Sequence, residues 1–360
     1  MMNTTGNRSA ELPLPDFYVP ENAERWAYRP DAALLLRRAA VWRERFRLRA
    51  AAEDSVRVRL LLVDVQKDFC FPEGALYVGG RSGRGALEDN RRTAEFIYRH
   101  LGRLTEIACT LDTHLPYQIF FPSFWLTEEG EPPEAHREVR LEDVRGGRLR
   151  PNPALAAWLT EGDHEWLKRQ AEFYCGELER AGKYTLYLWP PHCLLGSEGH
   201  ALVGVLQEAR LFHAFARLSP DLMRVKGEEP LTEHYSALRP ELMRAHDGGP
   251  IAKPSAAFTE RLLDSDVLIV AGQAASHCVR HTLEDLLKEV RARGPGRSPR
   301  VYILVDCMSS VAVPDPSEPG RFVADFTPQT EEALKRFSEA GMRPVRSTDP
   351  LGEWPEFPLP

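Results

Sequence analysis

The feature that most constrains this chain is an apolar run of strand length that leads, through small residues, to a cysteine at the start of a helix. The run begins at Val267 and is followed by the residues 271–277, which are mostly small. Apolar residues recur at helical spacing from Cys278 to Arg291. The pattern predicts a strand-to-helix turn that places one thiol at a helix N-terminus.

A thiol in that position can be unusually reactive. Free backbone N–H groups and aligned peptide dipoles at a helix N-terminus favour the thiolate. The same groups can hold a developing oxyanion, and we expect the backbone N–H groups of Ala274 and Cys278 to be the donors. The alternative is that Cys278 is a small core residue, as most free cysteines are.

Composition limits the class of protein. The 360 residues, 43% of them hydrophobic, suffice for one large α/β domain with insertions or for two domains. The six cysteines include no CxxC pair, so we expect free thiols in a reducing compartment and a cytoplasmic protein. The first part of the chain has no secretory-signal pattern, and no apolar stretch reaches about 18 residues, so we expect no membrane partner. The formal net charge of −7 argues against a nucleic-acid partner.

The chain divides into an extension, a domain and a tail. Residues 1–55 are interpreted as an N-terminal extension in which Asp31 caps a helix from Ala32 to Ala52. The arginines of that helix are explained by a solvated face, and an anionic partner is the alternative. Residues 348–360 form a Pro-rich tail that is either loose or docked.

Residues 126–183 are interpreted as an insertion. They comprise a polar loop, Glu128 to Arg150, and two helices, Asn152 to Leu159 and Asp163 to Ala181. We expect the insertion to cap the sheet edge or to form an oligomer contact, and we expect a homo-oligomer.

Strands and helices alternate through the domain of residues 56–347. This alternation predicts an α/β fold with a doubly wound, mainly parallel sheet that has helices on both faces. The predicted helices and strands are Val56 to Asp64, Asn90 to Leu104, Glu106 to His114, Gly199 to Leu218, Asp221 to Val225, Val267 onward, Cys278 to Arg291, Arg300 to Asp306, Thr327 to Ala340 and Arg343 to Ser347.

Side chains that can take part in catalysis or metal binding lie at the ends of several of these strands. Ligands bind outside the carboxyl ends of the strands in open α/β sheets, which is where Asp64 lies. Asp112 and His114 are two residues apart, so on an extended backbone both can face one metal ion. Lys226 near an aspartate and a thiol would be held charged by the first and would lower the pKa of the second. For Asp64 the alternative is a helix cap or turn residue. For Asp112 and His114 it is a carboxylate that merely orients a histidine, and for Lys226 it is a surface lysine.

His192 follows Trp189 and a proline pair. It is either a third metal ligand beside a flat pocket wall or a structural histidine.

Taken in chain order, these motifs resemble the nicotinamidase and isochorismatase-like cysteine hydrolases. Order and spacing together make the resemblance specific, where a single motif would not. The motifs are Val63-Asp-Val-Gln-Lys-Asp-Phe69 with Pro72, Gly74, Ala75 and Leu76, Asp112-Thr-His114, Trp189-Pro-Pro-His192-Cys193, Lys226-Gly227 with Tyr235-Ser236, and Gly272-Gln-Ala274 with Cys278-Val279.

The resemblance implies roles for particular residues. It implies a catalytic triad of Asp64, Lys226 and Cys278, and an oxyanion hole formed by Ala274 and Cys278 after a cis Gln273–Ala274 bond. The implied metal ligands and substrate-binding residues are Asp112, His114 and His192 for a divalent ion, and Phe69, Trp189 and Gln273 for the substrate. Two histidines and a carboxylate suit zinc first, with iron or manganese as alternatives.

The activity implied is release of ammonia from nicotinamide or a related small amide through a thioester. The chain departs from the family pattern at Thr113, at Ser276 and in the segment Gly196 to His200. These departures leave two alternatives open. One is a metal-independent cysteine amidohydrolase of another small amide, and the other is a non-catalytic binding or assembly protein on the same fold.

Overall fold

The computed structural model describes residues 11–182, 184–220, 222–294, 299–315 and 317–358. The first ten residues of the predicted extension, Lys183 in the predicted insertion, Asp221 in a predicted strand and the last two residues of the predicted tail lie outside the described residues.

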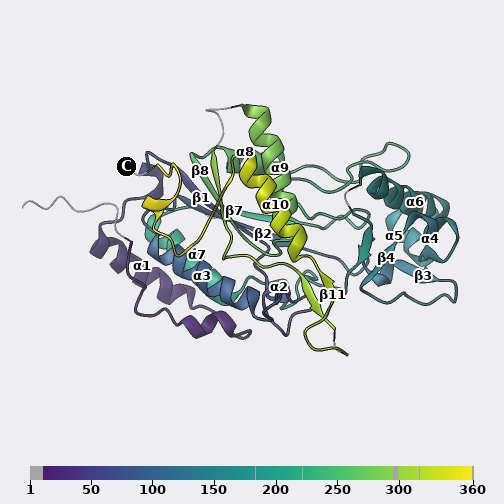
Figure 1. Ribbon diagram of the computed structural model, residues 1–360, viewed down its shortest axis with the longest axis horizontal. Coiled ribbons are helices and arrows are strands. Elements are labelled where there is room, and N and C mark those ends of the chain that lie inside the picture. Colours follow the sequence, from purple (N-terminus) through teal and green to yellow (C-terminus); the bar gives the residue numbers. More distant parts are fainter. Residues whose placement is uncertain (1–10, 183, 221, 295–298, 316, 359–360) are drawn as a thin grey trace, which may run out of the picture.

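Six parallel strands form the central sheet (Figure 1). Each of the five neighbouring pairs is parallel. In spatial order the strands are β12 (Arg343–Val345), β9 (Arg300–Leu304), β8 (Val267–Gly272), β1 (Val58–Val63), β2 (Glu106–Asp112) and β7 (Leu222–Lys226). The chain builds outward from β1 on one side through β2 and β7, and on the other through β8, β9 and β12. The direction of winding therefore reverses between β1 and β8, and ligands bind at such a switch point in open α/β sheets.

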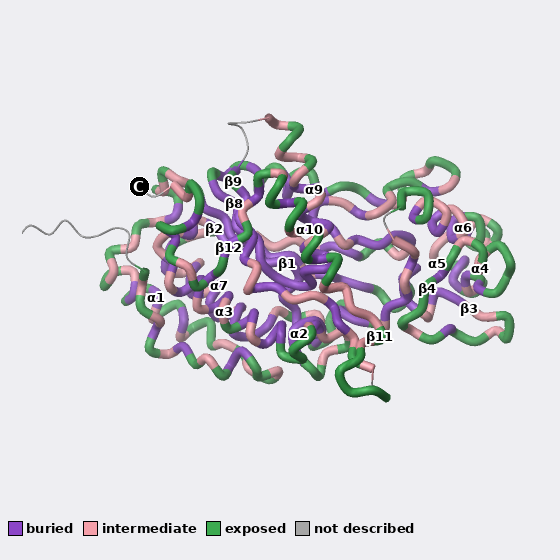
Figure 2. Tube along the Cα trace, viewed as in Figure 1, coloured by how far each residue is buried: buried purple, intermediate pink, exposed green. Residues whose placement is uncertain are grey.

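Two helical layers cover the sheet, as side-chain alternation along β1 requires. Leu60 and Leu62 point into one apolar cluster, and Leu61 and Val63 point into another. Strand β1 is buried along its whole length, as expected for a strand covered on both faces (Figure 2). The first cluster is built with α1 (Ala32–Phe46), α3 (Gly85–Arg99) and α7 (Gly204–Arg217), and the second with α8 (Ala256–Leu263), α9 (Cys278–Arg293) and α10 (Thr327–Glu339). The predicted fold class is confirmed.

The N-terminal helix packs into the molecule. Asp31 caps α1, as predicted, by accepting hydrogen bonds from the backbone N–H groups of Ala33 and Leu34. Helix α1 ends at Phe46, earlier than predicted, because Arg47 takes a left-handed conformation with φ of 50°. Trp42 on α1 meets Phe212 on α7 edge to face at 5.9 Å between ring centroids.

The predicted insertion lies to the right of the sheet in Figure 1. It packs into a third apolar cluster, which it shares with flanking residues such as Phe120, Trp189 and Leu231. The expectation of a loop from Glu128 to Arg150 is wrong, because this segment contains short regular elements. The strands β4 (Arg137–Val139) and β5 (Leu149–Pro151) and the helix α4 (Leu141–Arg145) escaped prediction because three to five residues show no period. The two predicted helices are present as α5 (Ala156–Leu159) and α6 (His164–Ala181). The flanking strands β3 (Trp125–Thr127) and β6 (Leu186–Leu188) pair with β5 and β4.

The remaining elements are short. They are helix α2 (Lys67–Cys70), the hairpin of β10 (Ala312–Pro314) and β11 (Phe322–Asp325), and the 3-10 turns η1 (Pro20–Glu24), η2 (Ala51–Glu53), η3 (Pro122–Phe124), η4 (Pro153–Leu155) and η5 (Leu351–Glu353). The hairpin was not predicted.

The tail docks rather than hanging loose. Trp354 is buried and stacks on Phe96, with 5.8 Å between ring centroids and 3° between ring planes. All six cysteines are free and buried, as expected of thiols that form no disulfide framework. Within the described ranges, no helix combines the length and apolar character that crossing a membrane requires.

Candidate active site

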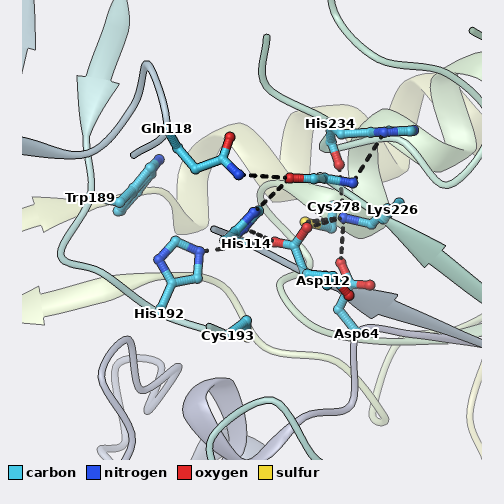
Figure 3. Close-up of polar contacts among 12 residues, drawn as sticks. Asp64, Asp112, His114, Gln118, Trp189, His192, Cys193, Lys226, His234 and Cys278 are labelled. Carbon is cyan, nitrogen blue, oxygen red and sulfur yellow. Dashed lines mark hydrogen bonds and ion pairs between the residues drawn. The ribbon is translucent and has the colours of Figure 1, made fainter. Parts of the chain in front are cut away.

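Four neighbouring strands each deliver one side chain to the same edge of the sheet. Asp64 follows β1, Asp112 ends β2, and Lys226 ends β7. Cys278 begins α9, shortly after β8. The structure thus brings together the acid, the lysine and the thiol that the sequence places far apart (Figure 3).

Lys226 lies at the centre of these groups and is completely buried. Its Nζ is 2.9 Å from Asp64 Oδ2 and 2.9 Å from Asp112 Oδ1. It also donates to the backbone carbonyl of His234 at 2.7 Å and lies 3.8 Å from Cys278 Sγ. Burial alone would lower the pKa of Lys226, but Asp112 and Asp64 outweigh it and raise the pKa well above its usual value. The ammonium is therefore held charged.

Asp64 is fixed by its backbone and by Thr110. The residue has a φ of 47°, a left-handed conformation that is uncommon outside glycine. Its backbone N–H donates to Thr110 Oγ1 at 3.0 Å, and that hydroxyl donates back to Asp64 Oδ1 at 2.6 Å. Burial raises the pKa of Asp64, and Lys226 opposes that rise. The carboxyl group is thus suited to accept and return a proton.

Cys278 is a buried thiol beside two acids. Its Sγ and carboxylate oxygens of Asp64 and Asp112 all lie within 4.8 Å of one another. Burial raises the pKa of Cys278 well above its usual value, and the positive charge of Lys226 opposes that rise. We expected the helix N-terminus and the lysine to lower the pKa of this thiol. Desolvation outweighs both effects. The thiol rests protonated and needs a base.

Two backbone amides next to the thiol are available as donors. The peptide bond Gln273–Ala274 is cis, as the family resemblance implied. Across the described part of the chain, no backbone partner is found for the N–H of Ala274 or of Cys278, whereas the neighbouring Ala275 donates to the carbonyl of Ser309 at 2.7 Å. Ala274 and Cys278 both line the pocket described below.

The three predicted metal ligands converge in a buried cluster. Asp112, His114 and His192 each present a ligand atom, and these atoms lie within 4.8 Å of one another. His114 Nε2 is 3.0 Å from Asp112 Oδ2, and His192 Nε2 is 3.9 Å from the same oxygen. The other ring nitrogen of each histidine faces a backbone carbonyl, that of Gly227 at 3.0 Å and that of Pro190 at 2.8 Å.

This hydrogen bonding fits a cation. A carbonyl accepts only from a protonated Nδ1, so in neutral rings both Nε2 atoms carry lone pairs that face a carboxylate oxygen. Lone pairs facing a carboxylate repel one another unless a proton or a metal ion lies between them. Backbone carbonyls that orient ligand histidines are a usual feature of metal sites. Burial and the neighbouring His114 lower the pKa of His192 to about 4, so its ring is neutral at pH 7.

Two residues hold the cluster in place. Gln66 donates from its side-chain amide to the carbonyl of Asp112 at 2.7 Å and accepts from the N–H of Asp112 at 2.7 Å. Gly227 has a φ of 89°, and a Cβ there would lie 2.7 Å from His114 Cε1 and 2.8 Å from Asp112 Oδ1. Glycine is therefore required for β7 to pass this close to the ligands.

A mostly aromatic and apolar pocket opens onto the thiol and the metal cluster. Phe69 and Trp189 line it, as predicted. Gln273 does not, because its side-chain amide donates to Asp89 at 2.9 Å and its oxygen accepts from the N–H of Ser309 at 3.2 Å. The lining residues are Phe69, Leu76, Val78, Asp112, His114, Phe120, Trp189, His192, Glu233, His234, Tyr235, Ala274, His277, Cys278 and Val311.

Several pocket residues were not identified from the sequence. Phe120 and His277 stand outside any motif that names a role. Tyr235 belongs to a recognised motif, but its contact, a hydrogen bond from Trp189 Nε1 at 2.8 Å, is not readable from spacing. Glu233 sits two residues before that tyrosine. Its place next to a motif was the one signal available.

The chain is similar to known nicotinamidases. No family model matches it. It is 35% identical to the nicotinamidase of Escherichia coli (strain K12) over 103 residues, which make up 28% of this chain and 39% of the relative. The match thus spans about two fifths of the curated relative's length. The resemblance to nicotinamidases predicted from the motifs is confirmed by this relative.

Solved structures show a looser likeness. The yeast nicotinamidase Pnc1p bound to the inhibitor nicotinaldehyde is 15% identical, with 80% of this chain and 99% of that chain covered and a TM-score of 0.49. The pyrazinamidase of Pyrococcus horikoshii in complex with zinc is 20% identical, with 80% and 98% covered and a TM-score of 0.41.

Proposed function

We propose that this relative of the nicotinamidases is a cysteine amidohydrolase that releases ammonia from nicotinamide or a related small aromatic amide. The observation that carries the proposal is the meeting of Asp64, Lys226 and Cys278 at one end of a pocket. A base, a fixed positive charge and a nucleophile within contact distance are the parts that acyl transfer requires.

The proposed reaction begins at the thiol. Asp64 takes the proton of Cys278, and the thiolate attacks the amide carbonyl carbon while the N–H groups of Ala274 and Cys278 hold the oxyanion. Protonated Asp64 then gives its proton to the departing nitrogen, which leaves as ammonia, and a thioester remains. Asp64 next deprotonates a water molecule that attacks the thioester. The carboxylic acid leaves, and the proton returns to the sulfur.

Lys226 keeps these steps electrostatically feasible. In each anionic state, negative charge is confined to a buried region that already contains Asp112. The ammonium 2.9 Å from both carboxylates and 3.8 Å from the sulfur compensates that charge wherever it resides.

Asp112, His114 and His192 are proposed to hold a divalent metal ion, with zinc favoured and iron or manganese as alternatives. When bound, such an ion would supply Lewis-acid attraction for a lone pair on the substrate and so orient the ring. Asp112 would then serve two groups at once, with Oδ1 toward Lys226 and Oδ2 toward the histidines.

Phe69 and Trp189 support an aromatic substrate. Both side chains line the pocket, and Trp189 is fixed by its hydrogen bond to Tyr235 at 2.8 Å. Apolar and aromatic walls with a few polar groups are typical of sites for small organic ligands.

The test is ammonia release from nicotinamide and a panel of small amides. We expect Cys278→Ala to lower kcat/KM by more than about 10³-fold, because the nucleophile is gone. Cys307→Ala, which also removes a buried thiol but lies outside the pocket lining, should retain most activity. Treatment with a chelator, followed by metal analysis and reconstitution with zinc, iron or manganese, addresses the metal.

The outcomes separate the alternatives. Activity that disappears with the thiol and with the metal supports the proposal. Activity that disappears with the thiol alone identifies a metal-independent amidohydrolase. No activity on any amide would contradict the proposal and favour a binding protein.

A further inference from the structure

Asp89 is a buried acid outside the pocket lining that the proposed mechanism does not use. It lies on α3, is 3% exposed, and accepts hydrogen bonds from three side chains. Oδ1 accepts from Arg92 Nη2 at 2.9 Å. Oδ2 accepts from Gln273 Nε2 at 2.9 Å and from Ser309 Oγ at 2.6 Å. Gln273 follows β8 and Ser309 follows β9, so one carboxylate oxygen ties α3 to the loops after two neighbouring strands.

The direction of these hydrogen bonds is fixed. The backbone N–H of Ser309 can only donate, so the oxygen of the Gln273 side-chain amide faces it at 3.2 Å. The NH₂ group of that amide therefore faces Asp89. Gln273 is 1% exposed, and both ends of its amide have a partner. A buried polar network whose members are satisfied is rigid and specifies one arrangement.

The network holds the chain on both sides of Ala274, one of the two proposed oxyanion donors. Gln273 precedes Ala274 and is tied to Ser309 by its side chain. Ala275 follows Ala274, and its backbone N–H donates to the carbonyl of Ser309 at 2.7 Å. Both of these contacts lead to Ser309, whose hydroxyl is held in turn by Asp89.

The second proposed donor, the N–H of Cys278, is placed by the same residue. The carbonyl of Ala274 accepts the backbone N–H of His277 at 3.0 Å and that of Val279 at 3.1 Å. These two residues flank Cys278, so a displacement of Ala274 would move both donors. Donors stabilise an oxyanion only where they are aimed at it, and a misplacement of about 1 Å can cost about 10²-fold in rate.

We propose that Asp89 is a positioning residue for the oxyanion hole and acts through Gln273 and Ser309 on the backbone at Ala274. The inference rests on the proposed function and adds to it an acid that does not touch the substrate. It also gives Gln273 a role other than substrate binding, since its side chain is committed to Asp89 and Ser309.

Three substitutions probe the network. Gln273→Met has a similar shape and removes both side-chain hydrogen bonds, while the backbone N–H of residue 273 can still donate to the carbonyl of Val63. Asp89→Leu removes the shared acceptor. Asp89→Asn can keep it, because the protons from Gln273 and Ser309 require the amide oxygen to take the place of Oδ2.

Gln170→Met is the matched control. Gln170 is a completely buried glutamine on α6 that accepts the backbone N–H of His246 at 2.9 Å and lies outside the pocket lining. The control therefore removes a buried amide of the same kind from a part of the fold that does not touch the oxyanion donors.

Ammonia release separates the variants. We expect Gln273→Met and Asp89→Leu to lower kcat by about 10- to 100-fold and to change KM by less than about 3-fold, because the donors act mainly in the transition state. Asp89→Asn and Gln170→Met should stay within about 3-fold of the wild type. An unchanged kcat in Gln273→Met, or equal losses in Asp89→Asn and Asp89→Leu, would overturn the inference.

A second reaction of the same thiol distinguishes positioning from general damage. With methyl methanethiosulfonate, the thiolate of Cys278 attacks sulfur, a disulfide forms, and methanesulfinate leaves, so no oxyanion develops on carbon. The rate of this modification, followed by mass spectrometry of the Cys278 peptide, should be the same in the wild type and in Gln273→Met. A rate that falls as much as kcat would mean that the network only supports the fold.

Benzaldehyde tests the donors without turnover. The thiol of Cys278 adds across the aldehyde carbonyl, so that a C–S bond forms, the π electrons pass to oxygen, and the thiol proton moves to that oxygen. Calorimetry should show about 10-fold weaker binding to Gln273→Met and unchanged binding to Asp89→Asn. This result without ammonia release from any amide would refute the proposed function and leave the inference intact. Ammonia release with equal affinities would do the reverse, and a wild type that shows neither reaction would overturn both.

Discussion

Lys226 is the residue on which the electrostatics of the site depend. It is fully buried, and its ammonium is 2.9 Å from each of two carboxylates. Two buried acids without a cation would have to bind protons or draw water into the core. The lysine therefore supports the fold and the chemistry together.

Lys226→Met should reveal both contributions. The methionine has a similar shape and no charge, so it leaves the carboxyl groups of Asp64 and Asp112 unpaired. We expect a loss of about 3–5 kcal/mol in the free energy of unfolding and a fall of at least about 10²-fold in kcat. Denaturant unfolding and ammonia release measure the two. Lys288→Met, which removes an exposed lysine paired with Asp285, should cost less than about 1 kcal/mol. Equal costs for the two variants would contradict this account.

At the scale of residues, the sequence identified groups whose type and position carry a signal. Asp64 and Lys226 stand at strand ends and Cys278 at a helix start, each inside a recognisable motif, and the structure brings them together. Thr110 and Glu233 carry no such signal, because a threonine within a strand and a glutamate in a loop are common. Their contacts are with neighbours distant in sequence, Asp64 for the first and Tyr174 and Tyr184 for the second.

At the scale of elements, the close approach of β7 to the end of β2 shapes the proposed metal site of Asp112, His114 and His192. Gly227 follows β7 at once and lies against Asp112 and His114. Gly227 has a φ of 89°, and Gly248 has a similar φ of 85°. A Cβ at Gly248, however, would have no heavy atom within 4 Å. The two glycines thus share the backbone penalty for an added side chain and differ in the clash.

Gly227→Ala should damage the metal site, and Gly248→Ala should not. Both variants should lose about 1–2 kcal/mol of stability because alanine disfavours positive φ. Gly227→Ala should in addition bind metal at least about 10-fold more weakly, since the methyl group displaces His114 or Asp112. Metal titration of both proteins makes the comparison. Equal metal affinities would show that β7 can move away without disturbing the ligands.

Elements were predictable where they were long enough to show a period. The buried strands β1 and β8 and the helix α9 follow from apolar runs and helical spacing. The insertion was less readable, because its strands have three residues each and are stabilised by Trp125, Leu149 and their neighbours in a separate cluster. Pairings such as that of β4 with β6 join segments almost fifty residues apart, which local patterns do not encode.

At the scale of the whole molecule, the extension, domain and tail share one core. The cluster on one face of the sheet includes Trp42 from α1, Phe212 from α7 and Trp354 from the tail. The division at residues 55 and 348 stays a prediction. The described parts of both flanking segments pack against the domain, so they are less separate from it than the sequence suggested.

That shared core contains a histidine whose burial ties stability to pH. His213 on α7 is buried, and its Nε2 lies 2.8 Å from the carbonyl of Leu104. Burial lowers the pKa of His213 to about 4, from 6.5 for an exposed histidine. Between about pH 6.5 and pH 4, His213 therefore binds a proton in the unfolded chain but stays neutral in the folded chain. Stability contributed by the neutral ring falls as pH drops from about 6.5 and levels off near pH 4.

His213→Gln should flatten this dependence while keeping a donor for Leu104. Between pH 6 and pH 4.5 the wild type should lose stability more steeply, by about 1.4 kcal/mol per pH unit for the one proton, and by about 3 kcal/mol over the whole range. Denaturant unfolding at several pH values measures the slope. His164→Gln, at the less buried start of α6, should keep the wild-type slope. A slope unchanged in His213→Gln would mean that the ring is already solvated or protonated in the folded protein, because only a neutral, desolvated histidine makes folding oppose proton uptake.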